Sequence, residues 1–177
     1  NRTLAKDMPG LRLSVHAAAE WGDDEAALAR CKADIATGDI VIVTMLFMED
    51  HFLPVLPALR ARRDQCDAMV CAMSAGEVMK LTRMGKFDMG SPATGAMAFL
   101  KRLRGKTSHK SDEQSVKSSA GAQQMKMLRR LPKILRFIPG TAQDVRAYFL
   151  TLQYWLAGSE QNIANMVRLL VKRYAHN

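Results

Sequence analysis

The sequence predicts an α/β fold: a flavodoxin-like parallel sheet followed by a helical segment. Two observations lead to this prediction. Residues 40–47 (IVIVTMLF) and 68–73 (AMVCAM) are continuous apolar runs, which are typical of strands buried on both faces. Residues 54–63 between them have a helical composition with a basic end, and strands that alternate with helices form parallel sheets with right-handed crossovers.

The region before the first apolar run continues the same alternation. Apolar and polar residues alternate over residues 11–15, which predicts a strand. Residues 23–37 (DDEAALARCKADIAT) predict a helix with acidic residues in its first turn and Gly38 as its stop. Residues 1–6 resemble the tail of a helix. We therefore expect that the first strand of the sheet is missing and that this chain, which lacks an initiator Met, is a piece of a longer one.

The second half of the chain is predicted to be mainly helical. Residues 75–84 and 94–104 are each expected to form a helix, and the Ser-rich residues 105–122 a flexible basic loop. From residue 123 onward apolar residues recur at spacings of three and four, with a kink expected at Pro132 and a break at Pro139. The predicted organisation is an α/β unit over residues 1–104, the loop over 105–122 and a helical segment over 123–177.

Two helices are predicted to form an αα-hairpin at the carboxyl end. Thr141 and Asp144 have the spacing of a capping box, and Gly158 with Ser159 would end one helix and cap the next. Tight joining of this kind favours antiparallel packing. The expected apolar faces are Val145, Phe149, Leu152 and Leu156 in the first helix, and Ile163, Met166, Val167, Leu170 and Tyr174 in the second.

The net charge of +9 comes from one segment. Residues 101–136 hold eleven basic and two acidic side chains, whereas residues 1–100 are slightly acidic. Within it, a basic face is predicted opposite the leucine stripe: Lys126, Arg129, Arg130, Lys133 and Arg136. This face is a solvated helix surface, a docking surface for an acidic partner or anionic lipid, or a nucleic-acid contact. No aromatic residue that could stack on bases lies in 101–136, so nucleic acid is not the expected partner.

The candidate chemical groups do not form a complete catalytic site. Glu49, Asp50 and His51 directly follow the first buried run, where α/β folds bind ligands, and could hold Mg²⁺ or move protons. The competing interpretation places Glu49 and Asp50 in the first turn of a helix, where they interact with its dipole. The phosphate-loop and dinucleotide motifs, a zinc-ligand spacing and a serine-nucleophile elbow are all missing. We therefore predict no catalytic residue, no resident metal and no cofactor in this chain.

Cysteine and hydropathy patterns bear on the compartment. The cysteines are Cys31, Cys66 and Cys71, an odd number without a C-x-x-C pair, which favours reduced thiols in a cytoplasmic protein. No apolar run approaches the length of about 18 residues that a membrane span requires. The first ten residues are polar, unlike a signal peptide.

Four stretches resemble one family. Residues 39–50 (DIVIVTMLFMED) resemble its strand and acidic turn, 68–89 its strand, helix and "MG-x-F-x-M" turn, and 128–137 its Leu-Pro-Lys segment. Residues 142–159 are the most specific, with Gln-Tyr-Trp-Leu at 153–156 followed by Gly158 and Ser159. In these stretches the chain is similar to the amino-terminal region of the large, porphyrin-binding component of magnesium chelatase. The large subunit of cobalt chelatase, from cobalamin synthesis, is the related alternative.

The resemblance implies a function for a longer parent protein. The parent would bind protoporphyrin IX and insert Mg²⁺ during chlorophyll or bacteriochlorophyll synthesis. It would act with an AAA+ partner that hydrolyses ATP and a partner that carries an integrin domain. The resemblance carries no catalytic or porphyrin-binding residue onto this chain, which we expect to act as a scaffold and docking region. The alternative from another class is a free-standing basic adaptor or nucleic-acid-binding module.

Overall fold

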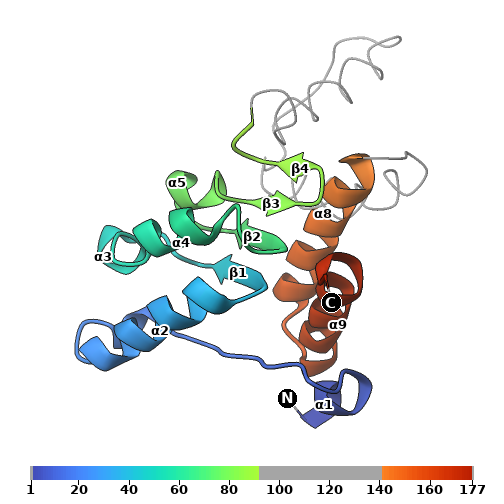
Figure 1. Ribbon diagram of the computed structural model, residues 1–177, viewed down its shortest axis with the longest axis horizontal. Coiled ribbons are helices and arrows are strands. Elements are labelled where there is room, and N and C mark those ends of the chain that lie inside the picture. The colour runs from blue at the N-terminus through green and yellow to red at the C-terminus, as the bar shows by residue number, and fades with distance from the viewer. Residues whose placement is uncertain (1, 92–140, 177) are drawn as a thin grey trace, which may run out of the picture.

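The computed structural model describes residues 2–91 and 141–176, and Figure 1 shows a sheet with helices on both faces. The described elements in chain order are α1 (Arg2–Asp7), η1 (Ala18–Glu20), α2 (Glu25–Thr37), β1 (Ile40–Thr44), α3 (Glu49–Phe52), α4 (Leu56–Arg62), β2 (Ala68–Ala72), α5 (Gly76–Met79), β3 (Arg83–Met84), β4 (Phe87–Asp88), α8 (Thr141–Ala157) and α9 (Glu160–Tyr174). This arrangement confirms the predicted α/β class.

The described sheet has four strands in the order β1-β2-β3-β4. β1 and β2 are parallel, with Ile40 opposite Ala68 and Thr44 opposite Ala72. β2 and β3 are antiparallel, as are β3 and β4. The parallel pair is therefore the part of the sheet that the sequence predicted, and the short hairpin β3–β4 extends it on the far side of β2.

Alternate side chains of β2 separate two hydrophobic cores, one on each face of the sheet. Ala68, Val70 and Ala72 face α8 and α9, and Met69 and Cys71 face α2 and α4. All five residues of β2 are buried. This is what a strand covered on both faces requires, and it explains why its sequence is continuously apolar.

The helix α2 ends at Thr37 before Gly38, as predicted, and begins at Glu25, two residues later than predicted. Asp24 is its N-cap, and its carboxylate accepts a hydrogen bond from Ala27 N–H at 3.0 Å. This cap, together with the Arg30 ion pair, keeps the pKa of Asp24 below its usual value, although desolvation opposes the shift. Ala27, Cys31 and Ile35 are buried, and their spacing of four residues places them on the one face of α2 that meets the sheet.

The two last helices form the predicted αα-hairpin across the second face (Figure 1). Gly158 ends α8 with φ +66°, and Ser159 caps α9 by accepting a hydrogen bond from Asn162 N–H. Val145 and Phe149 of α8 and the predicted face of α9 enter the core, with Ile163 only partly buried. Leu156 does not: it is exposed in the last turn of α8, so its assignment to the apolar face was wrong.

Two predicted elements differ in the structure. Residues 11–15 form no strand, since none of the described strands pairs with this segment, and Leu13 and Val15 are 39% and 85% exposed. Residues 75–84 are not one helix, since α5 ends at Met79 and β3 follows. The reason is that Arg83 and Met84 pair with β2 as strand β3, and Gly85, with φ +55°, then reverses the chain into β4.

The predicted capping box at Thr141 is also replaced by other contacts. Thr141 is already helical, and the Asp144 carboxylate binds Lys86, Arg173 and Tyr174. The first apolar run is a shorter strand than expected: β1 ends at Thr44, and the residues after it leave the sheet. The predicted helix over 94–104, the loop over 105–122, the kink at Pro132 and the basic face lie outside the described residues.

Candidate functional site

The loops that leave the parallel strands β1 and β2 have the same unusual backbone. Met45 follows β1 with φ 63°, and Met73 follows β2 with φ 48°. A left-handed conformation is unfavourable for side chains other than glycine, and strained residues of this kind gather at functional sites. Met45 N–H donates to Met73 C=O at 3.0 Å, so the two strained residues hold each other in place.

Ser74 makes a second link between the two loops. Its Oγ accepts a hydrogen bond from Leu46 N–H and donates one to Ala72 C=O, both at 3.1 Å. Ala75 N–H then donates to Leu46 C=O at 2.7 Å. The carboxyl ends of both strands therefore form one rigid unit, at the edge where open α/β sheets bind ligands and partners.

The outer surface of this unit is apolar. Met45, Phe47, Met48 and Leu53 are each between 50% and 57% exposed, and we call these four residues the apolar ledge. Four large apolar side chains exposed within nine residues make this segment a candidate contact surface. Methionine suits such a surface because its side chain adapts to the shape of a partner.

The predicted candidates Glu49, Asp50 and His51 lie beside the ledge in α3. Glu49 and Asp50 are exposed in the first turn of this helix, as the dipole interpretation expects. In residues 2–91 and 141–176 no three His, Cys, Asp or Glu side chains are grouped so that they could hold a metal ion.

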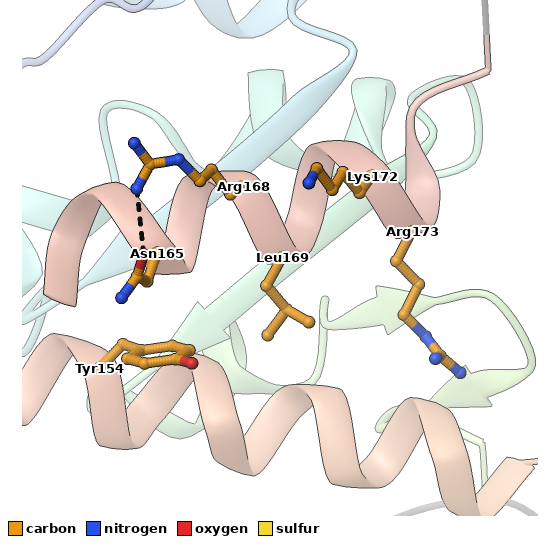
Figure 2. A pocket seen from close by; sticks show the side chains of 6 residues that line it. All are labelled: Tyr154, Asn165, Arg168, Leu169, Lys172 and Arg173. Atoms are coloured by element: carbon orange, nitrogen blue, oxygen red, sulfur yellow. Dashed lines mark hydrogen bonds between the residues drawn. The ribbon is translucent and has the colours of Figure 1, made fainter. Parts of the chain in front are cut away.

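A second surface feature is an open groove between α8 and α9. Figure 2 shows Leu169 and Arg173 directed from α9 toward α8, where Tyr154 lies. Two of its three basic residues already hold partners: Arg168 binds Asp7 and Asn165, and Arg173 binds Asp144. The groove therefore offers less free positive charge than its composition indicates.

The Asp144 carboxylate fixes α8 and α9 to the sheet. It is buried, and it accepts hydrogen bonds from Lys86 N–H at 3.0 Å, from the Tyr174 hydroxyl at 2.9 Å and from Arg173 at 3.2 Å. Burial, and then the charge of Asp144, raise the pKa of Tyr174. From the sequence, Asp144 was predicted only as part of a helix cap. Its partners Lys86 and Tyr174 lie 58 and 30 residues away, so no local sequence pattern indicates them.

All three cysteines are buried free thiols, without any disulfide between them. Burial raises the pKa of Cys71 to about 12. Burial also raises the pKa of Cys66 and Cys31. Thiols of this kind remain protonated and unreactive near neutral pH, so their role is packing. In the described parts of the chain, no helix has the length and apolar character of a membrane span.

Residues 1–149 match the family described as "Domain of unknown function (DUF3479)". The chain belongs to this family. It is 51% identical to the H component of the magnesium chelatase of Cereibacter sphaeroides over 174 residues, and 48% identical to that of Rhodobacter capsulatus. It is also 33% identical over 158 residues to the chloroplastic ChlH component of the magnesium chelatase of Oryza sativa subsp. japonica. These comparisons confirm the resemblance to the large component of magnesium chelatase.

The chain is much shorter than these relatives. The matches cover 98% of this chain for the two bacterial proteins and 88% for the rice protein. They cover 14% of each bacterial protein and 11% of the rice protein. The similarity thus extends over nearly all of this chain and a small part of each relative.

Proposed function

We propose that this chain is an amino-terminal part of the porphyrin-binding component of a magnesium chelatase. The parent would bind protoporphyrin IX and insert Mg²⁺ in the synthesis of chlorophyll or bacteriochlorophyll, in the cytoplasm of a bacterium. The observation that supports this most strongly is 51% identity to a magnesium-chelatase H component over 98% of the chain. The names of the matched relatives favour magnesium over cobalt, and favour a chelatase part over a free-standing adaptor.

Within the parent, we propose that this chain is a scaffold and docking region rather than the catalytic site. The apolar ledge supports this role, because a rigid, strained and exposed apolar surface suits contact with another protein surface. The partners would be the ATP-hydrolysing AAA+ protein, the integrin-domain protein or other parts of the same polypeptide. The basic residues Lys126, Arg129, Arg130, Lys133 and Arg136 form a second proposed docking surface.

The activity of the parent is tested by reconstitution. The full-length parent is mixed with its two partner proteins, ATP, Mg²⁺ and deuteroporphyrin, and the fluorescence of the magnesium porphyrin is followed. We expect metal insertion with Mg²⁺ that depends on ATP. Insertion of Co²⁺ but not Mg²⁺ would replace this proposal by the cobalt chelatase, and no insertion of either ion would contradict both.

The docking role is tested in the same assay with the double variant Phe47→Ser, Met48→Ser. We expect the rate of metal insertion to fall at least tenfold, while quenching of tryptophan fluorescence by deuteroporphyrin stays unchanged. The matched control is Leu156→Ser, which removes an exposed apolar side chain from α8, away from the ledge. An unchanged rate in the ledge variant would contradict a docking role for this surface.

A further inference from the structure

The strand β1 lies at an open edge of the described sheet. It pairs with β2 on one side, and no described strand pairs with it on the other. Met45 N–H bonds to Met73, and Asp39 C=O accepts from Asp67, both on the β2 side. Because backbone groups alternate in direction along a strand, Val41 and Val43 also point to β2. Ile40, Ile42 and Thr44 therefore point their N–H and C=O groups to the open side.

The side chains of β1 are those of an interior strand. Val41 and Val43 pack into the core against α2 and α4, while Ile40 and Ile42 pack against the core under α8 and α9. Natural edge strands are protected by charged residues, proline or bulges. The sequence IVIVT has none of these, so β1 has the character of a strand with neighbours on both sides.

The helices before β1 lie on opposite faces of the sheet. Leu4 of α1 packs against Ala164 and Val167 of α9. In contrast, α2 lies with α4 on the other face (Figure 1). Residues 11–15 connect α1 to η1 and α2, and they alternate apolar and polar side chains without a strand to pair with.

Handedness then determines the order of strands. A right-handed crossover through α2, on the same face as α4, places residues 11–15 on the open side of β1. The helix α1 lies on the opposite face of the sheet from α2. A right-handed crossover through α1 therefore runs in the opposite direction across the sheet. The strand that leads into α1 would then lie between β1 and residues 11–15. The two helices thus leave one strand position unfilled in the described sheet.

We propose that the open edge of β1 receives one further strand, apolar and parallel to β1, between β1 and residues 11–15. Its carboxyl end leads into α1, so the occupant is the segment of the parent polypeptide that precedes Asn1. The proposal is independent of the chelatase function. With the added strand in place, the strand order would reverse between β1 and this strand. The apolar ledge would then lie at the edge of the sheet that such folds use for binding.

The test compares residues 1–177 with a chain extended by about 25 upstream residues of the same reading frame, enough for a strand and its turn. Amide hydrogen exchange is measured by NMR. In the extended chain, exchange at Ile40, Ile42 and Thr44 should slow at least tenfold more than exchange at Val41 and Val43, which already bond to β2. Equal slowing at all five positions, or none, would overturn the proposal.

Two variants separate strand addition from a general gain in stability. Two prolines placed in the apolar part of the extension should abolish the selective protection, because proline cannot pair within a sheet. Val15→Asp should leave the melting temperature of residues 1–177 unchanged, since Val15 is 85% exposed there, but lower that of the extended chain. Protection that survives the prolines, or amides already protected in a dimer of residues 1–177, would contradict the proposed strand.

Discussion

The Tyr174 hydroxyl donates a hydrogen bond to the Asp144 carboxylate at 2.9 Å, joining the end of α9 to the beginning of α8. The same carboxylate accepts Lys86 N–H from the turn between β3 and β4. One buried acidic group therefore holds three segments together: both helices of the hairpin and the far edge of the sheet. The first three predictions concern this contact or the turn beside it.

Removing the carboxylate should destabilise the fold. In Asp144→Ala, the Lys86 N–H and the Tyr174 hydroxyl lose their acceptor, and the loss of such contacts costs about 2–4 kcal/mol in the free energy of unfolding. Urea unfolding followed by circular dichroism measures this. The control is Asp7→Ala, which breaks the exposed ion pair to Arg168 and should cost less than about 1 kcal/mol. Equal effects of the two variants would contradict the central role of Asp144.

Stability should fall at alkaline pH. Burial raises the pKa of both Tyr174 and Tyr148 above the value of about 10 for an unfolded chain. Above pH 10 the unfolded state loses these protons before the folded state does, so the free energy of unfolding decreases as pH rises. Urea midpoints should begin to decrease at about pH 8.5, where the buried thiols of Cys31, Cys66 and Cys71 have the same effect, and should decrease more steeply above about pH 10. The decrease should be smaller in Tyr148→Phe, and an unchanged slope in this variant would contradict the assignment.

Gly85 should not tolerate a side chain. Its φ is +55°, and a Cβ atom would lie 2.7 Å from Asp144 Oδ2. The combined strain and close contact in Gly85→Ala should cost about 1–3 kcal/mol. A matched control is Gly22→Ala, because nothing lies within 4 Å of a Cβ at that position and its φ is not positive. Thermal melting of both variants makes the comparison, and a neutral Gly85→Ala would disprove the argument.

Thr82 replaces a missing backbone partner for β2. Its Oγ1 accepts from Cys71 N–H at 3.1 Å and donates to Cys71 C=O at 2.9 Å, in a fully buried position. Thr82→Val keeps the shape but leaves the Cys71 N–H unpaired, which costs about 1–3 kcal/mol, while the Cys71 C=O keeps its hydrogen bond from the Tyr148 hydroxyl. Thr82→Ser keeps the hydroxyl and should cost clearly less. If chemical denaturation ranks serine below valine, the hydrogen bonds are not the reason for threonine here.

The left-handed backbone at Met45 should be relieved by glycine. Met45→Gly removes a strain of about 1–2 kcal/mol and sacrifices little packing, because this side chain is 51% exposed. We expect unchanged or slightly higher stability despite the entropic cost of glycine. Leu53 is similarly exposed but has φ −57°, so Leu53→Gly should lower the melting temperature. Similar losses in both variants would show that the strain is not stored at Met45.

Local sequence patterns were sufficient where neighbours in the chain make the structure. The end of α2 before Gly38, the glycine stop before Ser159 and the buried strand β2 were all predicted, because each depends on residues within a few positions or on continuous apolar character. Residues 11–15 and 75–84 were predicted wrongly. Their patterns fitted a strand and a helix, but no described strand pairs with residues 11–15, and residues 83–84 pair with β2 instead of continuing a helix.

The candidate site shows the same limit. The sequence pointed to the carboxyl end of β1 through Glu49, Asp50 and His51, and the structure places the apolar ledge beside them. Two of the ledge residues, Met45 and Phe47, belong to the apolar run that the sequence predicts to be buried. A strand that ends at Thr44 instead of residue 47 exposes side chains that a longer strand would bury.

The sequence by itself determined the α/β class, the helical hairpin and the resemblance to a chelatase component, because these depend on periodicity and local motifs. Only the tertiary structure decided which segments meet: Met45 with Met73, Asp144 with Lys86 and Tyr174, and α1 with α9 rather than α2. The physical reason is that packing and hydrogen bonding between distant segments leave no periodic trace in a single chain. The opposite placement of α1 and α2, which indicates the position of a further strand, is a contact of this kind.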